Sequence, residues 1–319
     1  MAVPNLSELA TATLERRSGK VRDNISNNNA LLLRLKEKEE EPVDGGRLIY
    51  EEVFFQENSN GNWYNGYDTL AVDAVDTMTA AEFDWKQYAV AVTMSGREEL
   101  INSGEEAVFN LLSKRIDAAE ITMANAIEDA LFSDGTTFGG NSLVGLDALV
   151  PQDPTTGTYG GINRATYTFW RSQLHDPGST PTATTINQAM NTLWVSCVRG
   201  TDRPNLILAG STTYNTYWQS LQSIQRIGDP KLGEMGFTTI KFNTADVVLC
   251  GGIGGQATAT DMYFLNTRYI HWRPHKRRNM VPIGGKRMSV NQDATVEILG
   301  FMGALTCSGP QFQGRGKFD

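Results

Sequence analysis

Apolar residues recur at helical spacing over one long stretch of the chain, residues 105–132. They step by three or four residues and so share one helical face. These residues are Val108, Leu112, Ile116, Ala119, Met123, Ala126 and Ala130. Ser103 is a candidate N-cap before the stretch, and the run 133–135, "SDG", ends it. We therefore predict one helix, ~40 Å long at roughly 1.5 Å per residue, that serves as a structural backbone.

A hairpin pattern precedes this helix in residues 47–83. The strand-like run "RLIYEEVFF" and a return strand, "YDTLAVDAVDTMT", flank a polar turn region that contains Trp63 and Tyr64. The turn region holds two Asn-Gly steps, at 60–61 and 65–66, which favour tight turns because both residues accept positive φ. We predict one long β-hairpin. A ribbon of two strands is not stable alone in water, so it must lie on another surface.

Residues 1–46 have the pattern of an arm rather than of a core. "LSELATATLERR" predicts a short helix that "SNNN" interrupts, and a second short helix starts at Ala30 and ends before Pro42. A helix this short is marginal alone, so leucines 31, 32, 33 and 35 are expected to need a surface belonging to something else. We expect the arm to become ordered only on assembly, with "VDGG" at 43–46 as its hinge.

The second half of the chain alternates between strand and helix patterns. We predict a helix from about Thr184, a buried strand in "PNLILAG", a helix capped at Ser211, and three strands in "FTTIKFN", "DVVLC" and "DMYFLN". This order predicts a compact α/β unit over residues 182–266. From Thr267 onward the pattern is again mostly strand, like "DWKQYAVAVTMS" at 84–95. The expected fold class is therefore α+β, with an α/β unit inserted into a second, elongated part.

Residues 143–173 form a turn-rich stretch that contains many aromatic residues but no acid/base pair, metal spacing or phosphate loop. Gly160 and Gly161 permit turns that are closed to other residues. Tyr167, Phe169 and Trp170 are expected to be packing anchors, either against a neighbouring subunit or in the subunit's own core.

Composition and charge exclude several classes of protein. The chain has 319 residues, 40% of them hydrophobic, which is enough for a sizeable core. Its net charge of −8 argues against a dedicated nucleic-acid-binding protein. The N-terminus has no apolar core of a signal peptide, and the longest weakly polar run, residues 298–309, is too short to span a bilayer. A soluble, intracellular protein with no membrane partner is expected.

No motif predicts catalysis, a cofactor or a metal site. "CGGIGGQA" after a strand resembles a dinucleotide loop, but a further strand follows it where a helix is required. His271 and His275 have a helical metal spacing that Pro274 would break. The three cysteines, 197, 250 and 307, match no zinc pattern and are expected to be buried and reduced. We predict no catalytic, cofactor-binding or metal-binding residues.

One charge pattern does stand out. Residues 268–287 hold seven lysines and arginines and no acid, whereas residues 47–83 hold seven acids and a single base. The basic segment could be a solvated surface, a nucleic-acid contact, or the surface that meets the acidic hairpin of a neighbouring copy. The last hypothesis gives a set of candidate contacts between subunits, which also includes two aromatic residues of the hairpin: Glu51, Glu52, Glu57, Trp63, Tyr64, Arg273, Arg277 and Arg278.

The order of these parts resembles the major capsid proteins of tailed bacteriophages, which have the HK97-like fold. Two phrases carry the resemblance: "KQYAVAVTMSGREELINSG", which leads into the long helix, and "GLDALV…PTTGTYGGINRATYTFWRSQ", which follows it. The resemblance implies an N-terminal arm (1–46), an extended hairpin called the E-loop (47–83) and a P-domain with the long spine helix (84–181). It further implies an inserted A-domain (182–266) and closing strands that return to the P-domain (267–319).

The resemblance also implies a function. Such a protein is structural rather than enzymatic: it forms hexamers and pentamers of an icosahedral shell and encloses double-stranded DNA without binding a specific sequence. Separate scaffolding, portal and decoration proteins are possible partners. The shell would be part of the virion and would assemble in the host cytoplasm. Some family members crosslink their E-loop to a neighbour through a lysine, but residues 47–83 contain none.

Two alternatives remain. An encapsulin-like compartment has the same fold but encloses protein cargo, and an arm of 46 residues favours the phage hypothesis over it. The other alternative is a soluble enzyme built on the α/β unit, which would be active as a small oligomer.

Overall fold

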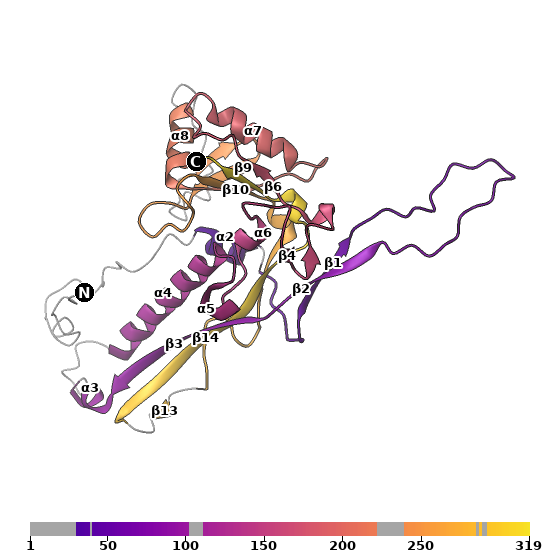
Figure 1. Ribbon diagram of the computed structural model, residues 1–319. Helices are drawn as coiled ribbons and strands as arrows, with labels where there is room; N and C mark the ends of the chain where they lie inside the picture. The colour runs from indigo at the N-terminus through magenta and orange to yellow at the C-terminus, as the bar shows by residue number, and fades with distance from the viewer. Residues whose placement is uncertain (1–29, 39, 102–110, 222–238, 285–286, 289–291) are drawn as a thin grey trace.

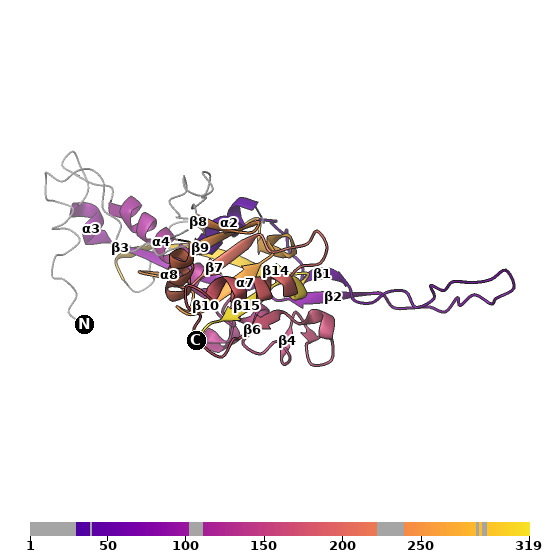
Figure 2. The same cartoon turned by 90° about the horizontal axis from the view of Figure 1, so that it is seen from above.

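The computed structural model describes residues 30–38, 40–101, 111–221, 239–284, 287–288 and 292–319. Three parts are distinct in Figure 1: an elongated part built on helix α4 and two long strands, an α/β unit above it, and a hairpin that projects away from both. The view from above in Figure 2 shows the same projection.

The elongated part is organised around β14 (Ala294–Cys307), the longest strand of the structure. One side of β14 pairs antiparallel with β3 (Lys86–Ser95) over ten residue pairs. The other side pairs with β11 (Ile270–Pro274), β12 (Val281–Pro282) and β13 (Arg287–Met288). Helix α4 (Leu111–Leu131) runs beside β3, as Figure 1 shows. The predicted strand at 84–95 and the mostly β tail are confirmed.

The buried face of α4 differs in part from the predicted face. A strict four-residue step leads from Ala119 through Met123 and Ile127 to Leu131, all of which are buried. The pattern predicted positions 126 and 130 instead, but both alanines are only half-buried. Isoleucine and leucine remove more apolar area from water than alanine, which explains the rotation of the face. The start of the predicted helix and the cap at 103 lie outside the described residues.

Three of the four leucines of α2 (Ala30–Lys38) are buried on their own chain. Leu31, Leu32 and Leu35 belong to the same core cluster as Met123, and Leu33 alone faces outward. The expectation that these leucines need a surface outside the subunit is therefore wrong. A nine-residue helix gains its stability from tertiary packing, and here its partner is an element far along the chain. The first predicted helix of the arm lies outside the described residues.

The stretch after α2 lies along the free edge of β11. The N–H of Glu41 donates to the carbonyl of Trp272 (2.9 Å), and the N–H of Val43 donates to that of Pro274 (2.9 Å). The N–H of Lys276 returns a bond to Val43 (3.1 Å), which completes a short parallel pairing. At Gly45 and Gly46 the backbone then takes φ values of 129° and 114° and leads into the projecting hairpin.

The α/β unit contains a six-stranded sheet whose strand order is β6-β15-β10-β7-β9-β8. Its strands are β6 (Gln173–His175), β7 (Leu206–Ala209), β8 (Thr239–Phe242), β9 (Ala245–Leu249), β10 (Asp261–Leu265) and β15 (Gly314–Lys317). Four of these strands fall where the sequence predicted them. The edge strand β6 and the inner strand β15 come from outside 182–266, so the sheet takes segments from both flanks of that range.

Two helices, α7 (Ile186–Ser196) and α8 (Ser211–Ser220), belong to this unit. Both were predicted, but Ser211 is not the cap of α8. Gly210 occupies the N-cap position, and no side chain caps the helix there. A Cβ at Gly210 would lie 2.0 Å from the carbonyl oxygen of Thr258, so the close approach of this turn requires glycine.

Short elements complete the described chain. They are α3 (Gly96–Ile101), α5 (Thr137–Gly140), α6 (Leu146–Leu149), β4 (Thr158–Tyr159), β5 (Ile162–Asn163), η1 (Thr168–Trp170), η2 (Thr267–Tyr269) and η3 (Pro310–Phe312).

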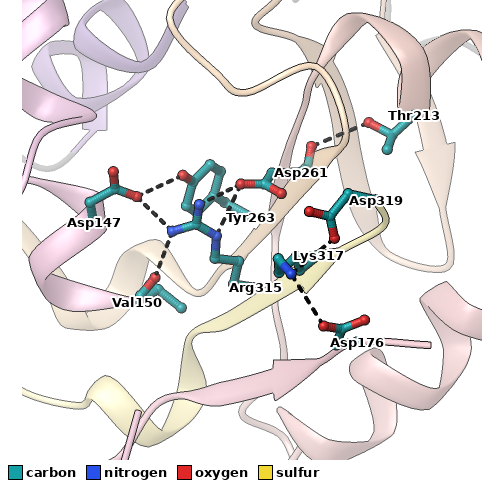
Figure 3. A network of polar contacts seen from close by, with 9 residues as sticks. All are labelled: Asp147, Val150, Asp176, Thr213, Asp261, Tyr263, Arg315, Lys317 and Asp319. Atoms are coloured by element: carbon teal, nitrogen blue, oxygen red, sulfur yellow. Dashed lines mark hydrogen bonds and ion pairs between the residues drawn. The ribbon is translucent and has the colours of Figure 1, made fainter. Parts of the chain in front are cut away.

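A buried arginine joins the α/β unit to the elongated part (Figure 3). Arg315 of β15 forms a salt bridge with Asp261 of β10, and both side chains are 3% exposed. Its Nη1 also donates to Asp147 of α6 (2.6 Å) and to the carbonyl of Val150 (3.4 Å). The hydroxyl of Tyr263 donates to the same Asp147 oxygen (3.0 Å). One side chain near the C-terminus thus connects two segments that are separated by more than a hundred residues.

Candidate functional site

The projecting hairpin rises from a short two-stranded stem. Strands β1 (Ile49–Phe54) and β2 (Met78–Phe83) pair antiparallel over six residue pairs. Residues of β1 alternate strictly, so Ile49, Glu51 and Val53 are buried while their neighbours face outward. The stem therefore has one face on the body, as expected of a ribbon that cannot stand alone.

The turn-rich stretch 143–173 supports this stem. The N–H of Glu82 in β2 donates to the carbonyl of Gly160 (2.9 Å). Gly160 has a φ of 56°, and a Cβ there would lie 3.1 Å from side-chain carbons of Ala81 and Phe83. Both the left-handed backbone and the close approach require glycine. The prediction that this stretch contains obligatory glycine turns is confirmed.

Two of the aromatic residues in this stretch belong to the subunit's own core. Trp170 is fully buried, and its Nε1 donates to the carbonyl of Tyr159 (2.8 Å), which is itself buried. The Tyr159 ring meets Phe83 of the stem edge-on, with 5.4 Å between ring centroids. The ring centroids of Phe169 and Phe55 lie 5.9 Å apart, and Phe55 is at the start of the hairpin's outer part. The stretch thus anchors the base of the hairpin.

Residues 55–77 form the outer part of the hairpin and contain no strand. Side chains replace the backbone ladder: Gln56 Nε2 donates to the carbonyl of Asp76 (2.6 Å) and Asn60 Nδ2 to that of Asp73 (2.5 Å). The predicted long ribbon is therefore paired only at its base. Polar side chains that bond the backbone compete with a regular ladder, which explains the difference.

The Asn-Gly steps do not form the turns that were predicted from them. Neither Gly61 nor Gly66 has a positive φ. At the second step, the N–H of Asp68 donates to the Asn65 carbonyl (2.8 Å), and the Asn65 N–H donates to an Asp68 carboxylate oxygen (2.7 Å). Reciprocal contacts of Asn65 and Asp68 close this turn.

The outer hairpin exposes large apolar side chains. The exposed fraction is 104% for Trp63, 103% for Tyr67 and 88% for Val72, and Tyr64 is also exposed. Isolated apolar residues on a surface are ordinary, but several on one projecting segment are typical of a contact with another molecule. Residues 55–77 also carry four acids and no base. The segment thus offers apolar and acidic groups to a partner.

Three of the seven basic residues in the segment 268–287 pair with acids of the same chain. Arg273 Nε donates to Glu51 (3.0 Å), and its guanidinium also pairs with Glu41. Lys276 pairs with Asp44 at 2.8 Å. In the same way, Arg268 pairs with Asp202 at 3.2 Å.

Two of the predicted contact residues therefore meet within one subunit. Glu51 is buried and also accepts a hydrogen bond from Thr306 Oγ1 (2.7 Å). Arg273 and Glu51 form an internal ion pair, which corrects the expectation that they reach a neighbouring copy. Local patterns could not show this pair, because its members are 222 residues apart.

The other candidates remain accessible. Glu52 and Glu57 are exposed, and so is Arg277. Arg278 is half-buried and donates to Gln87 Oε1 (3.3 Å). With Trp63 and Tyr64, these residues form the set that the structure leaves free to contact another subunit.

The features considered as possible chemistry have structural explanations. Cys197, Cys250 and Cys307 are free and buried, and burial raises the pKa of the Cys197 and Cys307 thiols to about 12. His275 packs edge-on against Trp85 (5.6 Å between centroids). Within the described residues, no group of three or more His, Cys, Asp or Glu side chains could hold a metal ion.

The glycine-rich turn lies between β9 and β10, and no helix follows it. Gly252 and Gly254 take positive φ values there, so the prediction of a turn between strands is confirmed. None of the helices in the described part of the chain combines the length and the apolar character needed to cross a membrane.

Comparison with known proteins identifies the fold. No protein-family model matches the chain, and no curated protein matches its sequence. Solved structures do match. The capsid asymmetric unit of cyanophage A-1(L) is 17% identical, with a TM-score of 0.70 over 96% of this chain and 97% of that chain. The capsid of a native GTA particle is 10% identical, with a TM-score of 0.61 over 99% of both chains.

An encapsulin is similar as well. The holo-SrpI encapsulin complex from Synechococcus elongatus is 13% identical, with a TM-score of 0.62 over 99% of this chain and 96% of that chain. At these identities the agreement establishes the fold, and it covers nearly the whole length of each chain. The chain has the HK97-like fold of phage major capsid proteins, as its sequence predicted.

Proposed function

We propose that this chain is a structural capsid protein of a tailed bacteriophage, whose copies assemble into an icosahedral shell around packaged double-stranded DNA. The observation that carries the proposal is the whole-length agreement in fold with phage capsid proteins. Because the match leaves no large segment of the chain unaccounted for, a structural role is favoured over an enzymatic one.

The parts of the structure correspond to parts of a shell subunit under this proposal. The projecting hairpin is the E-loop, α4 with β3 and β14 forms the P-domain and its spine helix, and the α/β unit is the A-domain. Residues 30–38 and 40–46 belong to the N-terminal arm. Hexamers and pentamers are the expected assemblies, and scaffolding, portal and decoration proteins are candidate partners. The virion is the expected location, after assembly in the host cytoplasm.

The hairpin supplies the physical reason for assembly. Its exposed aromatic and aliphatic side chains gain from burial only against another molecule. In a shell, every subunit would place this hairpin on a neighbour. Glu52, Glu57, Arg277 and Arg278 would add charge complementarity that favours the correct register.

A second candidate is an encapsulin-like compartment that encloses protein. The agreement with the Synechococcus encapsulin supports it, because its TM-score equals that of the GTA capsid within 0.01. The fold alone does not separate the two functions; the contents of the particle do.

The test is to purify the full-length protein from cells that express it and to measure its sedimentation. Megadalton particles are expected, and a species that stays a small oligomer under all assembly conditions would refute both candidates. Nuclease-protected double-stranded DNA in particles formed with the other phage proteins supports the first candidate. A packaged protein without DNA supports the second.

A hairpin variant tests the assembly route. Replacing residues 56–76 with a short Gly-Ser turn leaves the paired stem intact, so a folded, soluble subunit that forms no particles is expected. Replacing the exposed glycine-rich turn at 252–254 with a turn of equal length is the matched control, and its subunit should also remain folded. Normal particles from the hairpin variant would show that the hairpin does not drive assembly.

A further inference from the structure

The outer part of the hairpin carries the same dipeptide twice, Asn60-Gly61 and Asn65-Gly66, in different surroundings. Asparagine is a labile residue, and a following glycine makes it more so. The nitrogen of the next residue can attack the side-chain amide carbonyl, and glycine has no Cβ to hinder the approach. The reaction depends on where that nitrogen and that carbonyl lie. The hairpin therefore contains two chemically identical sites whose geometry can be compared.

At the second step the reacting groups lie next to one another. The N–H of Gly66 donates to Asn65 Oδ1 (2.9 Å), so the attacking nitrogen lies within hydrogen-bond distance of the carbonyl group that it must attack. The last torsion of an asparagine side chain is broad, and a rotation about it turns the carbonyl carbon toward this nitrogen. Both residues are exposed, so water reaches the site.

The contacts that close this turn favour the attack. The N–H of Asp68 donates to the main-chain carbonyl of Asn65 (2.8 Å), which belongs to the same peptide group as the Gly66 nitrogen. When that nitrogen loses its proton, negative charge spreads onto the carbonyl oxygen, and a donor there stabilises it. The Asp68 carboxylate, which accepts the Asn65 N–H (2.7 Å), acts against this charge, but the turn is exposed and water screens the repulsion.

At the first step the same groups are engaged elsewhere. The N–H of Gly61 donates to the carbonyl of Asn58 (3.4 Å). The side-chain amide of Asn60 donates across the hairpin to the carbonyl of Asp73 (2.5 Å), and Asn60 is half-buried. Attack at this step requires these hydrogen bonds to break first, and one net hydrogen bond corresponds to a factor of roughly two to ten in an equilibrium constant.

We propose that Asn65 is a site of spontaneous modification in the free subunit: the Gly66 nitrogen closes a succinimide ring, which water opens to aspartate or isoaspartate. Solvent hydroxide takes the Gly66 N–H proton, and the nitrogen forms a bond to Asn65 Cγ. The Cγ–Nδ2 bond breaks, and ammonia leaves with a proton from water. Water then adds to either ring carbonyl and breaks its bond to the ring nitrogen. The net change is hydrolysis of the side-chain amide.

The product changes the surface that the hairpin offers to a partner. Residues 55–77 already carry four acids and no base, and the modification adds a carboxylate beside Asp68. Isoaspartate also inserts a carbon into the main chain, which disrupts the reciprocal contacts of Asn65 and Asp68. Under the proposed capsid function, on which this consequence rests, subunits that stay unassembled lose their capacity to assemble as they age.

Peptide mapping of the full-length, unassembled subunit by mass spectrometry tests the proposal. The rates at positions 60 and 65 are measured in one sample, first in mildly alkaline buffer and then in denaturing urea. In the folded subunit Asn65 should react at least about two- to tenfold faster than Asn60. In urea the hairpin contacts are lost, so the two rates should become similar.

Gly66→Ala is the matched variant. Gly66 does not have a positive φ, and a Cβ there would meet no atom within 4 Å, so the turn should be kept. The new methyl group hinders attack by the neighbouring nitrogen, so Asn65 should become slower than Asn60, whose own rate should not change. Three results would overturn the proposal: an Asn60 that reacts first in the folded wild type, the same ratio of rates in buffer and in urea, or a Gly66→Ala variant with an unchanged rate at Asn65.

These measurements do not involve assembly, so they are independent of the proposed capsid function. The consequence for assembly is tested with Asn65→Asp, which carries the charge of one product. This variant should shift particle formation to a higher subunit concentration than the wild type, and an unchanged concentration would refute the consequence. A wild type that forms no particles would refute the capsid function and leave the modification standing.

Discussion

Replacing Arg315 with methionine should sharply destabilise the subunit. The substitution keeps most of the apolar stem but removes the cation between Asp261 and Asp147. Asp261 is 3% exposed and would be left as a buried acid without a counter-ion. Breaking a buried pair from one side costs about 3–5 kcal/mol, because the remaining charge is neither hydrated nor compensated. A loss of this size is expected in the free energy of unfolding at pH 7.

Two further variants make the estimate specific. Asp147 is 40% exposed, so Asp147→Asn leaves a partner that water can still reach and should cost no more than about 1 kcal/mol. The double variant Arg315→Met/Asp261→Asn removes both buried charges. It should be more stable than Arg315→Met alone by roughly 1–3 kcal/mol, because no buried charge is left over.

Urea unfolding of the soluble subunit, followed by circular dichroism, provides the measurement. Burial already raises the pKa of Asp261, so in Arg315→Met this acid should take up a proton readily and the loss of stability should shrink from pH 7 to pH 5. A loss below about 1 kcal/mol for Arg315→Met, or a double variant no more stable than the single one, would refute this account of the network.

Three other variants test the surfaces and the core. Trp63→Ala should raise the critical concentration for particle formation about tenfold or more, as expected when a central interface tryptophan is lost, whereas Asn58→Ala on the same hairpin should change it little. Glu57→Lys should weaken assembly, and adding Arg277→Glu in the same chain should partly restore it. The effect should be clearest at low salt, since a Debye length of ~10 Å at 0.1 M screens such pairs. Light scattering measured against salt concentration would detect this, and equal assembly of all variants would reject the pairing. Met123→Asp places a charge at a fully buried position of α4 and should cost at least ~3 kcal/mol, giving insoluble subunits; a soluble, unassembled variant would instead place that face at an interface.

The sequence predicted those elements whose patterns are local. The strands of the α/β unit are continuous apolar runs between turns, and β7 and β10 lie where these runs are. The spacing of apolar residues predicted the long helix and most of its buried face. The last turns of that face contain Ile127 and Leu131 rather than Ala126 and Ala130. Gly160 was identified because a turn with positive φ excludes other residues.

Features that depend on distant segments could not be predicted. Nothing near α2 in the sequence indicates that a glutamate 97 residues later would cap it. Likewise, Glu51 meets Arg273 across 222 residues. The opposite charges of the two segments could not reveal that one of their ion pairs forms within a single subunit. Of the candidate contact set, the hairpin aromatics Trp63 and Tyr64 are exposed within the described part of the chain, so they remain available to a partner.

The stretch at 40–43 has a consequence for solubility. Exposed sheet edges are templates for strand addition and for uncontrolled edge-to-edge growth between copies of a chain. Here the outer edge of β11 is occupied by the chain's own backbone, through the amides of Glu41, Val43 and Lys276. Pro274 leaves this edge without a donor at its own position, because proline has no N–H. The same few residues that connect α2 to the hairpin thus cover this edge, and under the proposed capsid function their removal would be expected to produce amorphous or fibrous aggregates rather than closed particles.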